Sequence, residues 1–400
     1  KAQEVETLTL EDCLRIGIDN NLSLEGKRKE IQKSKYGVSE NRSKLLPQIT
    51  VIAGYNNNFD PPVSVTDGSS YGVPYNITKT LQHTANAGLE MQMPLFNQTL
   101  YTSMSIAKVM EEISRLSYGK AREDIIMQIS KMYYLGQVTA EQIVLIKANI
   151  TRLEELRDIT QDFFDNGMSM EVDLKRVNIN LENLKVQYDN AQAMMKQQLN
   201  MLKYIMDYPA EKEFVLTPVN TDSITTVALT GLSENIYELQ LSQSQVQLAE
   251  KQKKIISNGY IPSLSLTGSW RYAAYTDKGY HWFHSGPSNH WFRSYGLGLT
   301  LRIPIFDGLD KTYKIKKAMI DIENSKLAWE NARKSLQTQY LNAVNDLMNN
   351  QRNFKKQKDN YLLEMQVSEA QNNYISAHYN YRITNLMLLK LTGQIESLVK

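Results

Sequence analysis

The sequence predicts an α+β protein made of two structural repeats, in which each repeat combines long α-helical hairpins with two β-strands. The first reason is a short stretch that occurs twice: an alternating run ends once at Pro94-Leu95-Phe96-Asn97 and again at Pro304-Ile305-Phe306-Asp307. Proline lacks the amide proton that a sheet interior needs and suits the first turn of a helix, so we expect each strand to lead directly into a helix. The second reason is that a long helical pattern without proline follows each copy.

The composition excludes several classes of protein. A net charge of +2 with 22% charged residues gives no bulk support for nucleic-acid binding or a polybasic membrane anchor. The single cysteine, Cys13, excludes an internal disulfide framework, and its apolar helical surroundings predict an inert buried thiol. No apolar run approaches the ~18 residues of a membrane-spanning helix, so we expect any membrane crossing to use strands. The chain begins at Lys1 without a signal peptide, as expected of a processed exported protein.

The first repeat covers residues 1–215 and begins with a helix start. Thr9 is the expected N-cap, and Asp12 follows three residues later. Two later runs alternate between apolar and polar residues, which predicts two strands. Residues 57–82 between them are rich in Asn, Pro and Gly, which predicts a loop. The expected elements are a helix over 9–45, strands over 48–56 and 84–93, and helices over 98–165 and 171–207.

The helix over 171–207 has the sharpest periodicity in the chain. Its apolar residues follow a strict alternation of three and four, and a sustained repeat of about 3.5 residues is typical of a coiled-coil seam. An ordinary amphipathic helix would have a period of about 3.6 residues and drift across the face, so we favour the coiled coil. The seam consists of Leu174, Val177, Leu181, Leu184, Tyr188, Ala191, Met195 and Leu202.

The second repeat covers residues 216–400. The expected elements are a helix over 232–258, strands over 263–272 and 295–303, and helices over 309–368 and 369–391. Compared with the first repeat, it lacks a counterpart of residues 158–182, which contain a turn at Gly167. Either the second hairpin is shorter, or a tip is missing between Ser368 and Glu369. We favour the missing tip, because a helix that ran straight through this point could not reverse.

The sequence offers no catalytic site. The loop expected over 273–293 contains His281, His284 and His290. Their spacing could suit a metal, but only Asp277 lies nearby as a further ligand, so we favour an aromatic surface loop. HExxH, P-loop and nucleophile-elbow motifs are missing from the sequence. We therefore predict no enzyme activity, no metal and no cofactor.

The four predicted strands have about the length that a tilted strand needs to cross a bilayer. A soluble sandwich would show the same alternation, but aromatic residues near the strand ends favour a membrane girdle. The candidate girdle residues are Tyr55, Trp270, Tyr272 and Trp291. The polar residues expected to face a lumen are Glu90, Gln92, Thr300 and Arg302. Since four strands cannot close a barrel and open edges are not tolerated in lipid, we expect three copies to share a 12-stranded barrel.

These features, in this order and with this duplication, resemble the TolC family of outer-membrane efflux proteins over nearly the whole chain. The matching motifs are Leu8 to Leu14 with Asn20 to Leu24, the strand entries Leu46-Pro47 and Ile261-Pro262, both strand exits, Gly167-Met168-Ser169 with Asp173-Leu174, and Ala370 to Tyr374 through Leu391-Thr392-Gly393. The resemblance implies a homotrimer that forms a 12-stranded β-barrel in the outer membrane of a Gram-negative bacterium and a long α-helical coiled-coil barrel in the periplasm.

The resemblance also implies a passive exit duct for a tripartite efflux or type I secretion system. Its expected partners are a periplasmic adaptor, or membrane fusion protein, and an inner-membrane RND or ABC transporter. The residues that match the family's tip motif, and are candidates for the adaptor contact, are Gly167, Met168, Ser169 and Asp173. Two alternatives stay open: a soluble trimeric coiled-coil structural or adhesin protein, which needs no apolar outward strand faces, and the periplasmic adaptor itself, against which the duplication argues.

Overall fold

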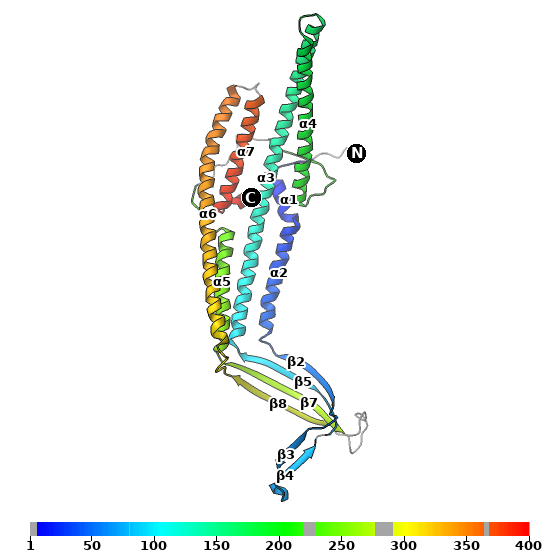
Figure 1. Cartoon of the computed structure of the whole chain (residues 1–400), viewed down its shortest axis with the longest axis vertical. Helices are drawn as coiled ribbons and strands as arrows, with labels where there is room; N and C mark the ends of the chain where they lie inside the picture. Colours follow the sequence, from blue (N-terminus) through cyan, green and yellow to red (C-terminus); the bar gives the residue numbers. More distant parts are fainter. Residues whose placement is uncertain (1–5, 80, 219–228, 277–290, 364–367, 400) are drawn as a thin grey trace. The chain divides into compact units, whose positions relative to one another are not determined.

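The computed structural model describes residues 6–79, 81–218, 229–276, 291–363 and 368–399 (Figure 1). The chain forms two compact units, and both halves of the sequence contribute to each. The helical unit comprises Lys1–Lys33, Glu112–Val246 and Asn324–Lys400, and the sheet unit comprises Ser34–Glu111 and Gln247–Glu323. The two repeats are therefore units of sequence, whereas each compact unit combines segments from both of them.

The sheet unit contains one four-stranded antiparallel sheet. Its strands are β2 (Gln48–Asn57), β5 (His83–Phe96), β7 (Ser263–Thr276) and β8 (Trp291–Arg302), in the order β2-β5-β7-β8. Figure 1 shows the four strands side by side. Each repeat supplies one pair of neighbouring strands, and the β5–β7 ladder joins the pairs. Within the described residues, β2 and β8 pair on one side only, so the sheet has two open edges.

Pro94 lies inside β5 rather than at its end. The pairing of β5 with β2 stops at Gln92, and a register shift between Pro94 and Phe96 marks a bulge on the β7 side. Proline is accommodated at sheet edges and bulges, because those positions do not need its missing amide proton. The prediction that this strand ends at the proline is therefore wrong.

The two repeats also leave their last strands differently. In the first, Asn97 alone separates β5 from helix α3 (Gln98–Asp165), and its Oδ1 accepts hydrogen bonds from the backbone N–H of Thr99 (3.0 Å) and Leu100 (3.3 Å). In the second, an irregular connector over 303–309 precedes helix α6 (Asp310–Leu363). The expected direct passage from strand to helix is therefore wrong for the second repeat.

The interval 57–82, expected to be a loop, contains a β-hairpin. Strands β3 (Val63–Asp67) and β4 (Tyr75–Lys79) pair antiparallel, and the short 3-10 helix η1 (Ser69–Tyr71) lies between them. The turn-forming residues around the hairpin obscured its short alternating runs. In the second repeat, β7 extends to Thr276 and β8 begins at Trp291, so the predicted loop is shorter at both ends. The three candidate histidines lie outside the described residues.

The helix expected over 9–45 is divided into α1 (Leu10–Asn20) and α2 (Leu22–Ser43). Thr9 caps α1 as predicted: its Oγ1 accepts from the Asp12 N–H, and its own N–H donates to Asp12 Oδ2, both at 3.1 Å. Asn21 separates the helices, because its Oδ1 accepts from Leu24 N–H (3.1 Å) while its Nδ2 donates to Ile205 O (2.7 Å). The remaining long helices are α4 (Glu171–Met206), α5 (Tyr237–Ser257) and α7 (Ser368–Leu391).

Two hydrophobic cores stabilise the helical unit. The first includes Cys13 and joins α1, α3 and α4 to strand β6 (Phe214–Leu216), which pairs with β1 (Glu6–Leu8). The prediction of a buried thiol is confirmed: Cys13 is fully buried, and its burial raises the pKa of the thiol to about 12. The second core joins α5, α6 and α7, and its buried members are Leu239, Leu336, Tyr340, Ala343, Leu347, Tyr381, Leu388 and Leu391.

The periodicity predicted for α4 agrees with its burial. Every seam position is half-buried or buried, and Leu181 and Leu202 are fully buried, with exposed fractions of 2% and 1%. Residues between the seam positions, such as Ile179 and Val186, are exposed. The apolar seam thus faces protein along the helix. No helix among the described residues combines the length and hydrophobicity required to span a membrane.

Helices α6 and α7 are antiparallel neighbours. Tyr361 stacks on Tyr374 with ring centroids 5.0 Å apart, and Asn350 Nδ2 donates to Thr384 Oγ1 (2.8 Å). Residues earlier in α6 thus contact residues later in α7. The two helices therefore run in opposite directions. Ser368 and Glu369 are consecutive residues of one helix. The predicted helix boundary between them is therefore wrong, whereas the missing tip in the second hairpin stays a prediction.

Candidate functional site

Strand register divides the four-stranded sheet into an apolar and a polar face. Directly opposed residues such as Val51, Leu89, Trp270 and Tyr295 fall on one face, and the adjacent row falls on the other. The apolar sheet face comprises Ile49, Val51, Tyr55, Leu89, Met91, Trp270, Tyr272, Trp291, Tyr295, Leu297, Leu299 and Leu301. The polar sheet face includes Gln48, Thr50, Glu90, Gln92, Ser265, Thr267, Ser269, Arg271, Thr300 and Arg302, and the apolar residues Ile52, Tyr275 and Phe292 also lie on it, while Arg293 lies on the apolar sheet face.

The apolar sheet face is largely exposed in the single chain. On its outer strands, Val51 is 73% exposed, Tyr295 76% and Leu297 79%. Exposed apolar area is unfavourable in water by roughly 25 cal/mol per Å². A contiguous patch of this kind marks a surface that contacts lipid or another protein chain.

Four aromatic residues predicted from the sequence lie on the apolar sheet face. Tyr55 and Trp291 occupy one row across the sheet, Tyr272 the next and Trp270 the third. The rings of Trp270 and Tyr272 meet edge to face, with centroids 5.4 Å apart. The Tyr55 hydroxyl lies 2.8 Å from Nδ1 of His83. Strand alternation and register thus gather these rings into one band at the end of the strands remote from Gln48.

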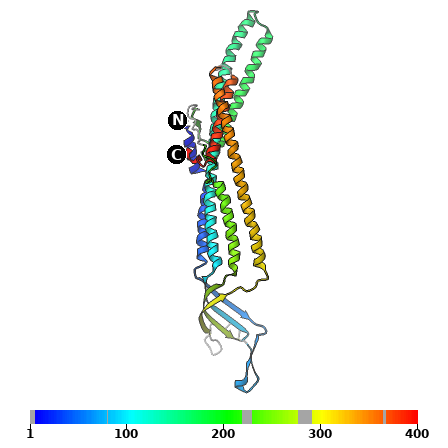
Figure 2. The same cartoon turned by 90° about the vertical axis from the view of Figure 1, so that its left-hand side faces the viewer.

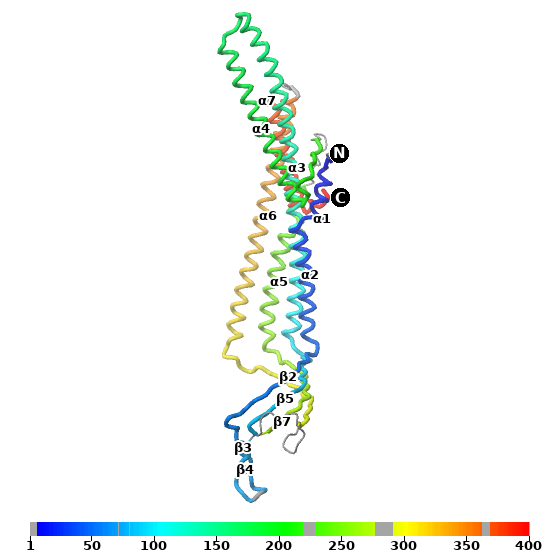
Figure 3. Tube along the Cα trace, turned by 90° about the vertical axis from the view of Figure 1, so that its right-hand side faces the viewer, coloured from blue at the N-terminus to red at the C-terminus, as the bar shows by residue number. Residues whose placement is uncertain are grey.

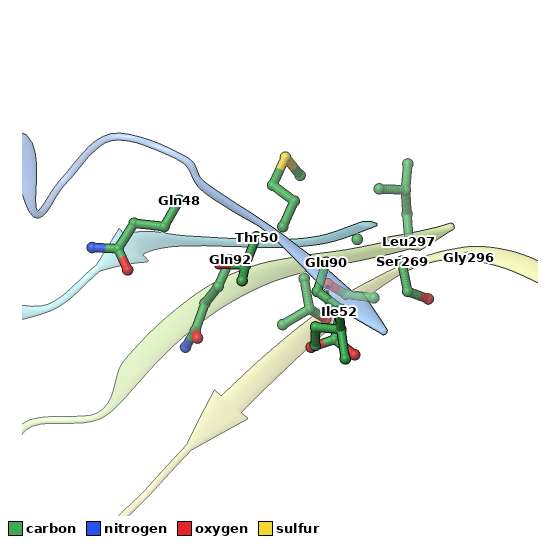
Figure 4. Close-up of a pocket in the computed structure, with 12 residues that line it drawn as sticks. Gln48, Thr50, Ile52, Glu90, Gln92, Ser269, Gly296 and Leu297 are labelled. Atoms are coloured by element: carbon green, nitrogen blue, oxygen red, sulfur yellow. Dashed lines mark hydrogen bonds between the residues drawn. The ribbon is translucent and has the colours of Figure 1, made fainter. Parts of the chain in front are cut away.

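All four residues predicted to face a lumen lie on the polar sheet face. Glu90 and Arg271 form a close ion pair across β5 and β7. A cavity of about 590 Å³ opens on this face (Figure 4) and is lined by polar residues of β2, β5 and β7, by Gly296, Leu297 and Gly298 of β8, and by Ile52, Met91 and Gly268. Figure 4 shows Gln48, Thr50, Glu90 and Gln92 around it.

A second cavity, of about 410 Å³, lies at the end of the polar sheet face next to the helix connections. Gln92, Thr300 and Arg302 line it, together with Lys44 from the segment before β2. The cavity therefore combines amide and hydroxyl groups with two cationic side chains. Lys44 was not among the predicted site residues, because it precedes the strand and no alternation indicates its direction.

The predicted tip is the turn between α3 and α4, and Figures 2 and 3 show the two helices running side by side to it. Gly167 has φ +74°, and its N–H donates to Phe164 O (2.9 Å). The next N–H, of Met168, donates to Phe163 O (2.7 Å). No other group lies within 4 Å of a Cβ at Gly167, so the turn requires glycine for its backbone conformation rather than for space.

The side chains of the tip form a mixed surface. Ser169 Oγ donates to Thr160 O (3.4 Å), and Asp173 forms an ion pair with Arg176 (3.6 Å). Met168 is 69% exposed. Further exposed apolar residues lie around the predicted four, among them Phe163, Met170 and Val172.

Sequence reasoning also missed a buried carboxyl group in the helical unit. Glu123 on α3 is 4% exposed, and its burial raises the pKa of the carboxyl to about 7, against the opposing effect of Lys390. Neighbouring charges are paired: Arg122 with Glu396 at 3.1 Å and Lys390 with Asp124 at 2.5 Å. The only sequence signal was a charged run at 120–124, which is typical of a solvated helix face.

Comparison with known proteins gives consistent results. The family model described as "Outer membrane efflux protein" matches residues 16–206. The "Outer membrane protein TolC" of Vibrio cholerae is 21% identical over 316 residues, which are 78% of this chain and 66% of that protein. The chain thus spans slightly less than two thirds of the length of this curated relative.

Solved structures share the fold. The structure of CusC, described in connection with transmembrane channel formation, superposes with a TM-score of 0.77 at 14% identity, covering 96% of this chain and 91% of that one. The CmeC outer membrane channel of Campylobacter jejuni superposes with a TM-score of 0.67 at 18% identity, covering 96% and 85%.

Proposed function

Because the chain belongs to the TolC family of outer membrane efflux proteins, we propose that it forms the exit duct of a tripartite efflux pump or a type I secretion system in the outer membrane of a Gram-negative bacterium. The duct is passive. An inner-membrane RND or ABC transporter supplies the energy, and a periplasmic adaptor connects the two. The cargo crosses without covalent chemistry, so the proposal requires no catalytic residue or cofactor.

One observation carries the proposal: an open four-stranded sheet with one exposed apolar face and two unpaired edge strands. Unpaired backbone groups are not tolerated in lipid, so a membrane sheet must close on itself. Three copies of a four-stranded sheet, joined edge to edge, make a closed cylinder of twelve strands. Two copies would give eight strands, whose interior is filled by side chains, so the homotrimer is the smallest assembly that closes around a conducting lumen.

The two sheet faces suit the two environments of such a cylinder. The apolar sheet face would contact acyl chains, and its band of Tyr55, Trp270, Tyr272 and Trp291 would lie at the lipid–water boundary, where aromatic rings are favoured. The polar sheet face, with Glu90, Gln92, Thr300 and Arg302, would line the lumen. A soluble coiled-coil or adhesin protein offers no reason for this division of the faces.

The helices would continue the duct into the periplasm. The seam of α4 is typical of a coiled coil. At the tip, Gly167, Met168, Ser169 and Asp173 match the family motif, and exposed methionine and aromatic side chains suit a protein contact. The adaptor and pump would open the tip by favouring one of two arrangements of the packed helices.

Fractionation of membranes tests the proposal. We expect the protein in the outer-membrane fraction, extractable only with detergent, as a homotrimer that co-purifies with an adaptor and an inner-membrane transporter. A protein that stays dispersed without detergent, as a monomer or a soluble coiled coil, would contradict it.

A further inference from the structure

The polar sheet face has an unbalanced charge. Its charged residues are Glu90, Arg271 and Arg302, and the first two form an ion pair. The Arg302 side chain makes no hydrogen bond and no ion pair with any residue that the structure describes. The face therefore carries one uncompensated positive charge, at its end next to the helix connections.

The surroundings of Arg302 favour a negatively charged group. It shares the cavity of about 410 Å³ with neutral hydrogen-bonding side chains, among them Gln48, Gln92 and Thr300. Lys44 also lines this cavity. Lys44 forms an ion pair with Glu40 (3.4 Å), but both side chains are exposed to solvent, and exposed ion pairs contribute little to stability. No acidic side chain lines the cavity.

We propose that Arg302 is a specificity-determining residue that makes the strand region select anions and so favours cargo that carries a carboxylate, sulfate or phosphate group. The inference rests on the proposed function, because it requires the polar sheet face to line a water-filled lumen. Threefold symmetry would then place three Arg302 side chains at one level, and rings of cationic side chains are typical of pores for anions. A cargo molecule arriving from the helices would meet this ring before the rest of the strands.

The expected strength is moderate. Arg302 is exposed, and charges in water are screened over about 10 Å at 0.1 M ionic strength. An elementary charge about 8 Å from the path of an ion in water changes its probability of occupancy by about twofold. This is enough to bias passage without trapping an anion permanently.

The test is the ion selectivity of the purified trimer in a planar lipid bilayer under a KCl gradient, at or below 0.1 M salt. We expect the reversal potential of the wild type to indicate selectivity for chloride. Arg302→Gln removes three charges from the trimer and acts in opposite senses on chloride and potassium, so it should lower the chloride-to-potassium permeability ratio about tenfold. Arg302→Lys, which keeps the charge, should leave the sign of the selectivity unchanged.

The chain supplies a matched control. Arg293 lies on the same strand, nine positions away, but on the opposite face in the row of Tyr272. Arg293→Gln should not change selectivity. The inference is overturned if Arg302→Gln forms conducting trimers with wild-type selectivity, or if Arg293→Gln has an equal effect. A wild-type protein that forms no conducting pore contradicts the proposed function itself.

Discussion

At the scale of single residues, the structure identifies two positions, and at each of them a single physical cause determines the contribution to stability. Glu123 is buried among charged neighbours that already have partners, and Gly167 adopts a backbone conformation that L-residues avoid. Neither cause lies in the local sequence pattern. The environment of Glu123 depends on contacts with distant parts of the chain. The sequence indicated a turn at Gly167, but it did not indicate that the φ angle of this residue is positive.

Glu123 should make stability depend on pH. Because its pKa is about 7 in the folded chain and ordinarily 4.5, the folded state holds the proton more tightly. Its contribution is therefore fully present below about pH 4.5 and is lost as the pH rises through about 7. The full effect is on the order of 3 kcal/mol. We expect Glu123→Gln to raise the melting temperature relative to the wild type at pH 8 but to change it little at pH 4.5, as measured by circular dichroism. Parallel pH profiles for the two proteins would contradict this account.

Gly167→Ala should destabilise the tip, because the left-handed conformation is unfavourable for alanine by about 1 kcal/mol. Gly37 is a matched control: it lies inside α2, and a Cβ there also meets no neighbour within 4 Å. Gly37→Ala should stabilise the protein by about 0.5–1 kcal/mol. Hydrogen exchange of the tip amides measures the first effect and denaturant unfolding the second. If Gly167→Ala and Gly37→Ala changed stability equally and in the same direction, the backbone conformation of Gly167 would not be the reason that the tip requires glycine.

At the scale of secondary-structure elements, periodicity predicted best where one element contains its own signal. The burial of α4 follows its heptad seam, and the faces of β7 follow its alternation. Prediction was wrong where a distant contact decides the outcome. The break at Asn21 depends on Ile205, and the pairing of β1 with β6 joins two three-residue strands far apart in sequence. The four sheet-face candidates at 90, 92, 300 and 302 were accessible from alternation alone, whereas Lys44 was not.

The seam of α4 should contribute to stability in proportion to burial. Leu181 is 2% exposed, and truncation of a buried leucine leaves a cavity that costs about 2–5 kcal/mol. Ile179, two residues away, is 61% exposed, and its truncation should change stability by less than about 0.5 kcal/mol. We expect Leu181→Ala to lower the denaturant midpoint clearly and Ile179→Ala to leave it nearly unchanged. The reverse order would show that another face of α4 is buried in the assembled protein.

At the scale of the whole molecule, one chain does not complete its own sheet. The edge strands β2 and β8 are exposed along their whole length, while the central strands are partly buried. The sequence predicted this incompleteness from the number of strands, and the register adds the division into two faces. The account therefore depends on the edges being joined by other copies of the chain.

Oxidative cross-linking tests that claim most directly. Val51→Cys on β2 would be combined, one at a time, with cysteines at apolar sheet-face positions of β8, namely Tyr295, Leu297 and Leu299. As a control, Val51→Cys with Leu89→Cys joins residues that face each other within one chain. The account predicts a covalent trimer, resistant to denaturation without reductant, for at least one β2–β8 pair and only monomers for the control. Properly folded protein in membranes that yields only monomers from every β2–β8 pair would contradict it.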